Sequence, residues 1–140
     1  MQSIQSSIKV LPMTAIRTIA RSMLAASALL AAGQAFAHPQ LLASTPADKA
    51  EIAAPARIEL QFSESLVVRV SGAKLVMTGM PGMADHAPMS VATRVSAGDN
   101  PKTMVITPSS PLVPGTYRVD WRAVSADTHP VAGKFSFTVK

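Results

Sequence analysis

Residues 115–124 read GTYRVDWRAV, and this stretch determines the fold that we expect. Apolar and polar side chains alternate along it without interruption. The apolar positions are Tyr117, Val119, Trp121 and Ala123, and the polar positions are Arg118, Asp120 and Arg122. Successive side chains of a β-strand point to opposite faces, so this period of two predicts a strand with one face in a core and the other in solvent.

The segments on both sides of this stretch show related patterns. Residues 56–62 (ARIELQF) alternate in the same way, and Phe135, Phe137 and Val139 close the chain on one face. Further strands are expected at 66–70, 73–77, 91–96 and 102–107. Turn residues recur at strand-plus-turn spacing, and no window after residue 37 keeps a helical stripe. We therefore predict an all-β fold, a single Greek-key β-sandwich or barrel of about seven strands.

The N-terminal segment has the features of a secretory signal peptide. Its first 22 residues carry Lys9, Arg17 and Arg21 without any acidic residue, and residues 23–32 (MLAASALLAA) are apolar but too short to span a bilayer comfortably. The sequence Ala35-Phe36-Ala37 has the small-x-small pattern that signal peptidase recognises. We expect residues 1–37 to be removed after Ala37, leaving an exported domain at 38–140 that does not span the membrane.

Removal of this leader changes the charge of the protein. The whole chain has 13 Lys and Arg against 8 Asp and Glu, a formal net charge of +5, but three of those cations lie in the leader. About +2 remains, without a basic stripe interleaved with aromatic residues, so nucleic-acid binding is not expected. The chain has no cysteine, which excludes disulfides and thiolate metal sites.

His38 would become the first residue of the processed chain. A free α-amine and Nδ1 of the same histidine can close a chelate ring on one metal ion. Pro39 has no backbone N–H, so a binding mode that needs a deprotonated second amide nitrogen is not available. The competing interpretation is that His38 is only the first residue of a frayed terminus.

A carboxylate and an imidazole are two residues apart in SADTHPVAG, residues 125–133. In an extended segment Asp127 and His129 would point to the same side. Nitrogen and oxygen ligands of this kind suit Cu(II), which has the highest affinity in the divalent series. The alternative is an aspartate that accepts a hydrogen bond from a turn amide beside a solvated histidine.

Residues 77–89 read MTGMPGMADHAPM, with a methionine or histidine at every third position. These positions are Met77, Met80, Met83, His86 and Met89. The glycines and prolines between them prevent regular structure, so a loop is expected. Thioethers are soft ligands that select Cu(I). An apolar flap packed on the sandwich, or an adaptable methionine-rich protein-binding surface, would give the same composition.

Three separated motifs occur together in this chain. They are a leader ending in AFA before HPQL at 35–41, the methionine-rich segment at 77–89, and WRAVSADTHPVAGKFSFTV at 121–139. Together they resemble the CopC family of periplasmic copper-resistance proteins, which includes PcoC. The resemblance implies a seven-stranded β-sandwich of cupredoxin-like or immunoglobulin-like form.

The resemblance also implies two copper sites, because a methionine-rich loop marks the two-site subtype of this family. Cu(II) would be held at one end of the sandwich by His38, Asp127 and His129. Cu(I) would be held at the other end by residues of the loop, which are Met77, Met80, Met83, His86 and Met89. Met77 could instead close the preceding strand with its side chain inward.

The function implied is a periplasmic copper carrier that catalyses no reaction. Its implied partners are copper ions, an inner-membrane CopD-like copper transport protein and a periplasmic multicopper oxidase. One alternative is a copper monooxygenase with a histidine brace, although Asp127 would occupy a coordination position that oxygen activation needs open. Another is an immunoglobulin-like interaction module that binds no metal.

Overall fold

The computed structural model describes residues 38–83 and 86–140. The predicted leader, residues 1–37, lies outside the described residues. Within the described ranges no helix has the length and apolar character needed to cross a bilayer.

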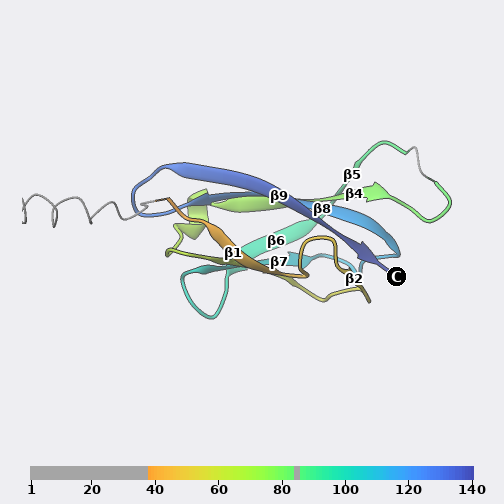
Figure 1. The fold of residues 1–140 in the computed structure, drawn as a ribbon, viewed down its shortest axis with the longest axis horizontal. Coiled ribbons are helices and arrows are strands. Elements are labelled where there is room, and N and C mark those ends of the chain that lie inside the picture. Colours follow the sequence, from red (N-terminus) through yellow and green to blue (C-terminus); the bar gives the residue numbers. More distant parts are fainter. Residues whose placement is uncertain (1–37, 84–85) are drawn as a thin grey trace, which may run out of the picture. The chain divides into compact units, whose positions relative to one another are not determined.

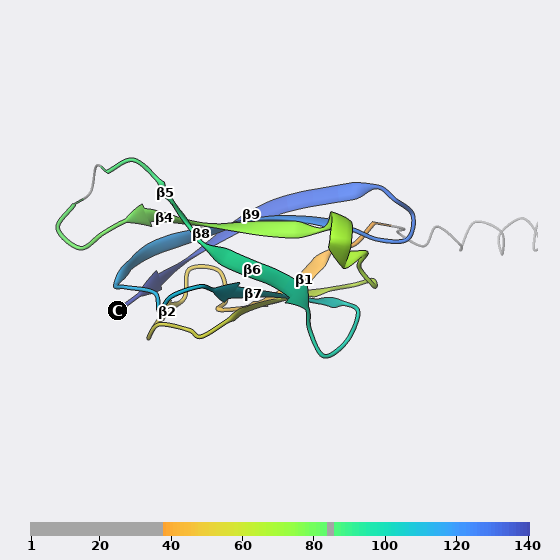
Figure 2. The ribbon, with the colours of Figure 1, turned by 180° about the vertical axis from the view of Figure 1, so that it is seen from behind.

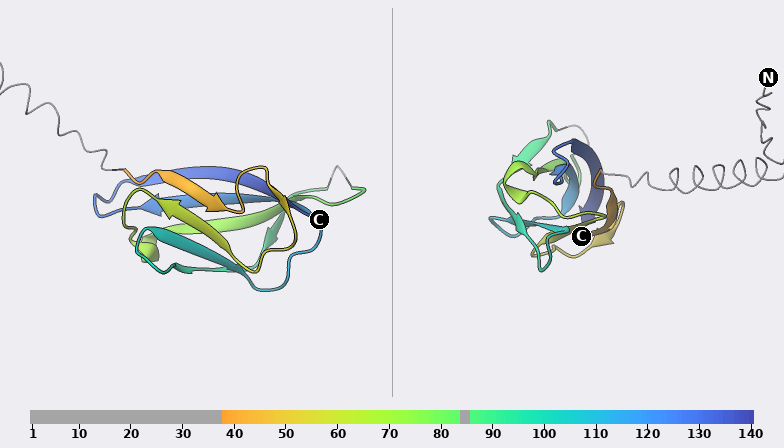
Figure 3. Two further views of the ribbon diagram at one scale, coloured as in Figure 1. Left: turned by 60° about the horizontal axis from the view of Figure 1, so that its bottom comes forward. Right: turned by 90° about the vertical axis from the view of Figure 1, so that its left-hand side faces the viewer.

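The described chain forms two β-sheets that pack face to face (Figures 1 and 3). The four-stranded sheet has the order β1-β3-β7-β6, and the five-stranded sheet has the order β2-β9-β8-β4-β5. The strands of the first sheet are β1 (Leu41–Thr45), β3 (Ile58–Phe62), β7 (Thr103–Pro108) and β6 (Thr93–Ala97). Those of the second are β2 (Glu51–Ile52), β9 (Pro130–Val139), β8 (Gly115–Val124), β4 (Gly72–Gly79) and β5 (Met89–Val91).

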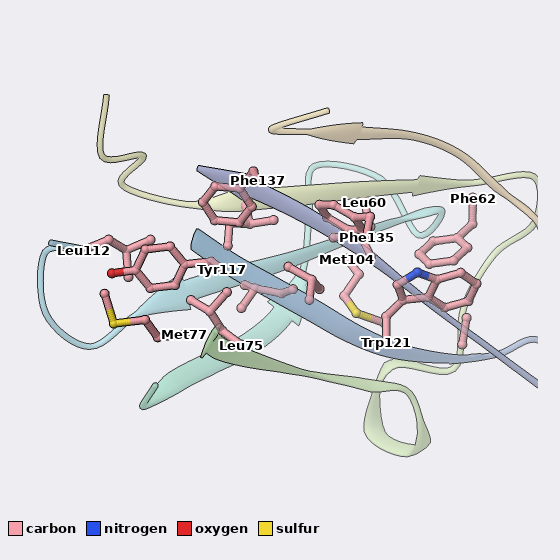
Figure 4. Packing of buried hydrophobic residues seen from close by; sticks show 14 of the residues in the cluster. Leu60, Phe62, Leu75, Met77, Met104, Leu112, Tyr117, Trp121, Phe135 and Phe137 are labelled. Carbon is pink, nitrogen blue, oxygen red and sulfur yellow. The ribbon is translucent and has the colours of Figure 1, made fainter. Parts of the chain in front are cut away.

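The predicted all-β sandwich is confirmed, and β8 has the predicted limits. Its apolar side chains alternate into the core as expected, with Tyr117 at 1% and Trp121 at 8% exposure. Figure 4 shows the packed interior, where Trp121 meets Phe62 edge to face with 5.2 Å between ring centroids, and Tyr117 stacks on Phe137 at 5.6 Å. The Tyr117 hydroxyl donates to the carbonyl of Val113 at 2.7 Å, which satisfies its polar end inside the core.

Two predicted strands are wrong in detail. Residues 66–70 do not form a strand, because Val68–Val70 is a short 3-10 turn and Leu66 makes only an isolated bridge to Ser125. The Ser71 hydroxyl donates to the carbonyl of Val67 at 3.0 Å and so holds this turn closed. The sequence pattern at 66–70 predicts a strand because it does not reveal such local side-chain hydrogen bonds.

The expected strand at 91–96 is in fact two strands in different sheets. β5 pairs with β4, whereas β6 pairs with β7 in the other sheet, as Figure 2 shows. The chain changes sheets at Ala92, whose carbonyl accepts the N–H of Ser109 at 2.9 Å.

The two strands nearest the N-terminus are not predicted by the sequence pattern. β1 has mostly exposed side chains, and β2 has only two residues. Neither shows the alternation that predicts a strand, because both lie at sheet edges, where one-sided burial is weak.

The contact between Trp121 and Gly133 gives a direct test of the packing. A methyl group added at Gly133 would lie 2.4 Å from Cζ2 of Trp121, a position that real Cβ atoms do not occupy. We expect Gly133→Ala to lower the free energy of unfolding by about 1–3 kcal/mol through overpacking, measured by denaturant unfolding.

The matched control is Gly72→Ala, in β4 of the same sheet. An added Cβ there meets no atom within 4 Å, so its effect on the unfolding free energy should stay within about 1 kcal/mol. Equal stability of the two variants would contradict the packing described for Trp121.

Candidate metal centre

The turn between β8 and β9 lies at one end of the sandwich, beside the point where the described chain begins (Figure 1). Pro39 is fully buried directly after His38. Gln40 N–H donates to Ser63 Oγ at 2.9 Å, and Ser63 N–H donates back to the Gln40 carbonyl at 2.9 Å. The chain is thus fixed from Pro39 onward, and His38 stands at the surface next to an anchored residue.

The β8–β9 turn brings Asp127 and His129 to this point, but not in the way that the sequence predicted. The segment is not extended, since Thr128 N–H donates to the Ser125 carbonyl at 3.0 Å and Thr128 has a φ of 67°, in the left-handed region. The expectation of an extended D-x-H segment is therefore wrong. The tight turn, rather than strand alternation, places the two side chains on the same side.

Three side chains converge on one point at this end. His38 Nδ1 lies 2.9 Å from Asp127 Oδ2, and His129 Nδ1 lies 3.5 Å from the same oxygen. The imidazole rings meet edge to face with centroids 5.4 Å apart. One potential ligand atom from each residue lies within 4.8 Å of the others, and Asp127 is 19% exposed, whereas the histidines are 59% and 71% exposed.

Asp127 is the best-organised member of the cluster. Its Oδ1 accepts the Ser125 hydroxyl at 2.7 Å and the backbone N–H of His129 at 3.2 Å. The pKa of Asp127 is lowered from 3.8 to about 2, mainly by the hydrogen bond from Ser125 and to a smaller extent by the contact with His38. The carboxylate is therefore ionised at neutral pH, and Oδ2 faces both imidazoles.

This arrangement suits a divalent transition metal. Metal–ligand bonds of roughly 2.0–2.2 Å around one ion place ligand atoms up to roughly 4.4 Å apart, so the cluster needs only a small closure. Two imidazoles and a carboxylate form a nitrogen and oxygen donor set of the type that suits Cu(II). The turn-amide hydrogen bond proposed as an alternative is also present, and it uses Oδ1 rather than the oxygen that faces the histidines.

The methionine-rich segment joins β4 to β5 at the opposite end of the sandwich (Figure 1). Met83 N–H donates to the Met80 carbonyl at 3.0 Å around Gly82, whose φ of 77° permits this tight turn. Met83 is 55% and Met89 is 47% exposed, whereas Met80 packs partly against the core. Met80 and Met83 also line a pocket of about 340 Å³ beside Gly115, Thr116 and Thr138.

His86 presents one ring nitrogen in a form that can bind a metal. Its Nδ1 lies 2.7 Å from the Ala87 carbonyl, which can only accept, so Nδ1 carries the proton. In the neutral imidazole, Nε2 then has a free lone pair. That atom is buried, and no hydrogen-bond partner reaches it from the described part of the chain.

Met77 differs from the other four candidates in its burial, although it pairs with Met89 across β4 and β5. Its side chain is 4% exposed and belongs to the hydrophobic core, where Figure 4 shows it beside Tyr117 and Leu112. Its Cε occupies the space in front of Gly115, 2.4 Å from where a Cβ would stand. The expected role of Met77 as a Cu(I) ligand stays a prediction, because burial alone does not test it. The inward alternative, that it closes the preceding strand, describes what the structure shows.

Two residues organise the cluster in ways that the sequence pattern does not predict. Pro39 anchors His38 by its own burial, and Ser125 fixes the Asp127 carboxylate. The S-x-D spacing was a usable signal for Ser125, because serine and aspartate side chains commonly bond within turns. Burial of Pro39 had no signal in the sequence.

The Ser125 hydrogen bond can be tested by titration. Ser125→Ala removes the largest cause of the shift, so the pKa of Asp127 should rise from about 2 toward its ordinary value, followed by NMR of the carboxyl carbon. A depressed folded pKa contributes stability above about pH 4 that is lost as the pH falls toward 2. The variant should lose less stability than the parent over that interval, and an unchanged pKa would contradict the assigned cause.

Comparison with known proteins places this chain in a family. The family model of the CopC domain matches residues 41–140. The chain is 63% identical over 115 residues to copper resistance protein C of Pseudomonas syringae pv. tomato, covering 82% of this chain and 90% of that one. It is 59% identical over 106 residues to copper resistance protein C of Escherichia coli, covering 76% and 84%.

A solved structure shares the fold. The crystal structure of PcoC, a methionine-rich copper resistance protein from Escherichia coli, matches with a TM-score of 0.70 and 58% identity, covering 74% of this chain and 100% of that chain. The match of the family model to residues 41–140, together with these identities, shows that the chain belongs to the CopC domain family.

Proposed function

We propose that this protein binds copper in the periplasm and carries or sequesters it as part of copper resistance. The convergence of His38, Asp127 and His129 on one point is the observation that carries the proposal. The relatives named copper resistance protein C, at 63% and 59% identity, support copper as the metal.

The proposed Cu(II) site uses the processed N-terminus. Cleavage after Ala37 gives His38 a free α-amine, which adds a second nitrogen from the same residue to the two imidazoles and the carboxylate. Four donors of nitrogen and oxygen type suit the tetragonal geometry of Cu(II). The fixed position of Pro39 supports this site, because an anchored second residue holds the amine near the cluster.

The proposed Cu(I) site lies on the β4–β5 loop and uses Met80, Met83, His86 and Met89. The exposed thioethers of Met83 and Met89 and the free Nε2 of His86 support it. Met77 is left out of this ligand set, because the structure uses its side chain in the core. Thioethers and an imidazole are the soft donors available in a chain without cysteine.

Transport or storage fits these sites better than catalysis. Asp127 lies between the two histidines, in a position that a histidine-brace oxidase would need to keep open for oxygen. Two sites of different softness would let the oxidation state of copper determine which end of the molecule is loaded. Copper would then pass to partners, for which we propose a CopD-like inner-membrane protein and a periplasmic multicopper oxidase.

The first test of the Cu(II) site compares the natural N-terminus with a blocked one. Protein purified after export should bind one Cu(II), whereas His38→Ala or one extra residue before His38 should weaken binding at least about tenfold in competition titrations. Cu(I) binding should remain. Equal Cu(II) affinity of the extended and natural forms would show that the amine is not a ligand.

Cu(II) affinity should also fall as the pH decreases through the titration range of imidazole and the amine, roughly 6.5 to 8.0, because protons compete for those nitrogens. Asp127 stays ionised throughout this range, since its pKa is about 2. The same Cu(II) titration, followed to lower pH, measures the protonation of the nitrogen ligands first and that of Asp127 afterwards. A flat profile between pH 8 and 6 would exclude nitrogen ligation.

The Cu(I) site can be tested with matched methionine substitutions. Replacing Met80, Met83 and Met89 together by leucine keeps the side-chain volume but removes three thioethers, so anaerobic Cu(I) affinity should fall at least about tenfold while Cu(II) affinity is unchanged. Met77→Leu is the control and should leave Cu(I) affinity intact, because that side chain is in the core. A loss of Cu(I) affinity in Met77→Leu without a loss in the triple variant would show that Met77, and not the three loop methionines, binds Cu(I).

A further inference from the structure

The outer face of the five-stranded sheet carries a compact group of positive charges. The strand register places Lys74 of β4, Asp120 of β8 and Lys134 of β9 side by side in one row. Arg118 and Arg122 lie two residues away along β8, one on each side of that row. We call Lys74, Arg118, Arg122 and Lys134 the basic sheet face.

The acidic residue in the middle of this face does not neutralise it. Asp120 accepts hydrogen bonds from Nε and Nη2 of Arg118 at 2.8 and 3.0 Å. Its negative charge is therefore paired with one of the four cations and leaves the other three unbalanced. Lys74, Arg122 and Lys134 are exposed, and none of them takes part in an ion pair within the described ranges. A net excess of three positive charges remains.

The spacing lets these charges act together. Neighbouring strands are about 4.8 Å apart, and alternate residues of a strand are roughly 7 Å apart, so the four Cα atoms span about 10 by 14 Å. The shorter side of this span is comparable to the Debye length of about 8–10 Å, so the fields of neighbouring cations add. On the outer face of the other sheet, Arg57 and Glu59 form an ion pair without net charge, so among the described residues Arg94 of β6 is the unpaired cation that these strands present there. The positive charge is thus concentrated on one sheet.

The face has the chemistry of a protein contact rather than of a membrane contact. The large apolar side chains that are exposed are Leu42, Val70, Met83, Met89 and Val113, none of which lies on β4, β8 or β9. Of these exposed apolar residues, Val70 borders the face, since its carbonyl accepts Nη1 of Arg122 at 2.7 Å. None stands within the array of cations, as the apolar anchors of a lipid-binding surface do. A regular array of ammonium and guanidinium groups instead matches a row of carboxylates on a folded surface.

The position of the face connects it to the candidate metal centre. Arg122 pairs with Ala132 across the β8–β9 hairpin, and the chain between these strands is the turn that holds Asp127 and His129. A protein seated on the face therefore has one edge beside the cluster. We propose that the basic sheet face docks the acidic surface of a protein partner. That this partner handles copper rests on the proposed function, whereas the electrostatic contact does not.

The experiment uses isotope-labelled protein, purified after export, and a synthetic decaglutamate peptide at low ionic strength. Amide shifts should change at Lys74, Asp120 and Lys134 and should vanish as salt is added. Lys74→Gln with Lys134→Gln removes two unpaired cations without touching the metal cluster, and should weaken peptide binding by about fivefold.

The control pair Arg94→Gln with Lys102→Gln removes the same net charge elsewhere and should weaken peptide binding by less than about twofold. Equal weakening by both pairs, or shifts that map to the other sheet, would overturn the proposal. So would binding to phosphatidylglycerol vesicles without binding to the peptide. Cu(II) titration of the Lys74/Lys134 variant should match the parent, and a parent that docks the peptide but binds no Cu(II) would refute the proposed function while leaving the docking surface intact.

Discussion

The antiparallel pairing of β8 with β9 is the constraint on which the rest of the structure depends. It runs from Gly115 opposite Val139 to Val124 opposite Pro130. At one end the hairpin turn presents Asp127 and His129, and at the other Gly115 makes room for the Met77 side chain below the β4–β5 loop. A shift of one residue in this register would turn every core side chain of β8 to the solvent and would separate the ligand atoms.

The two candidate sites differ in how strongly the fold organises them. Asp127 is bonded on one oxygen by a buried serine and a turn amide, so its other oxygen is held toward the imidazoles before any metal arrives. The loop site is looser. One methionine packs on the core while two are exposed, and Gly82 supplies a turn that other residues would adopt with strain. If copper binds as proposed, a preorganised nitrogen and oxygen site and an adaptable thioether site would suit the different coordination preferences of Cu(II) and Cu(I).

Core packing and surface charge come from the same strand. The inward residues of β8 build the aromatic core around Trp121 and Tyr117, and its outward residues supply the centre of the basic sheet face. Because the strand alternates, substitutions on its outer side alter charge without opening the core. The outward residues of β8 are also not members of the metal cluster, so the surface contact and the metal cluster can be tested independently.

The alternation in 115–124, the missing cysteines and the spaced methionines were visible in the sequence, and they determined the all-β fold and the kinds of ligand available. The edge strands β1 and β2 were not visible, because weak burial leaves little periodicity. Asp127 and His129 were identified from the sequence, but through an extended segment that is in fact a turn with Thr128 in the left-handed region. Only the tertiary structure brought His38, 89 residues away along the chain, within 2.9 Å of Asp127, and only packing assigned Met77 to the core and Met83 to the surface. Side-chain type and period are local properties of a sequence, whereas the meeting of distant residues depends on strand register and on which side chains fill the core.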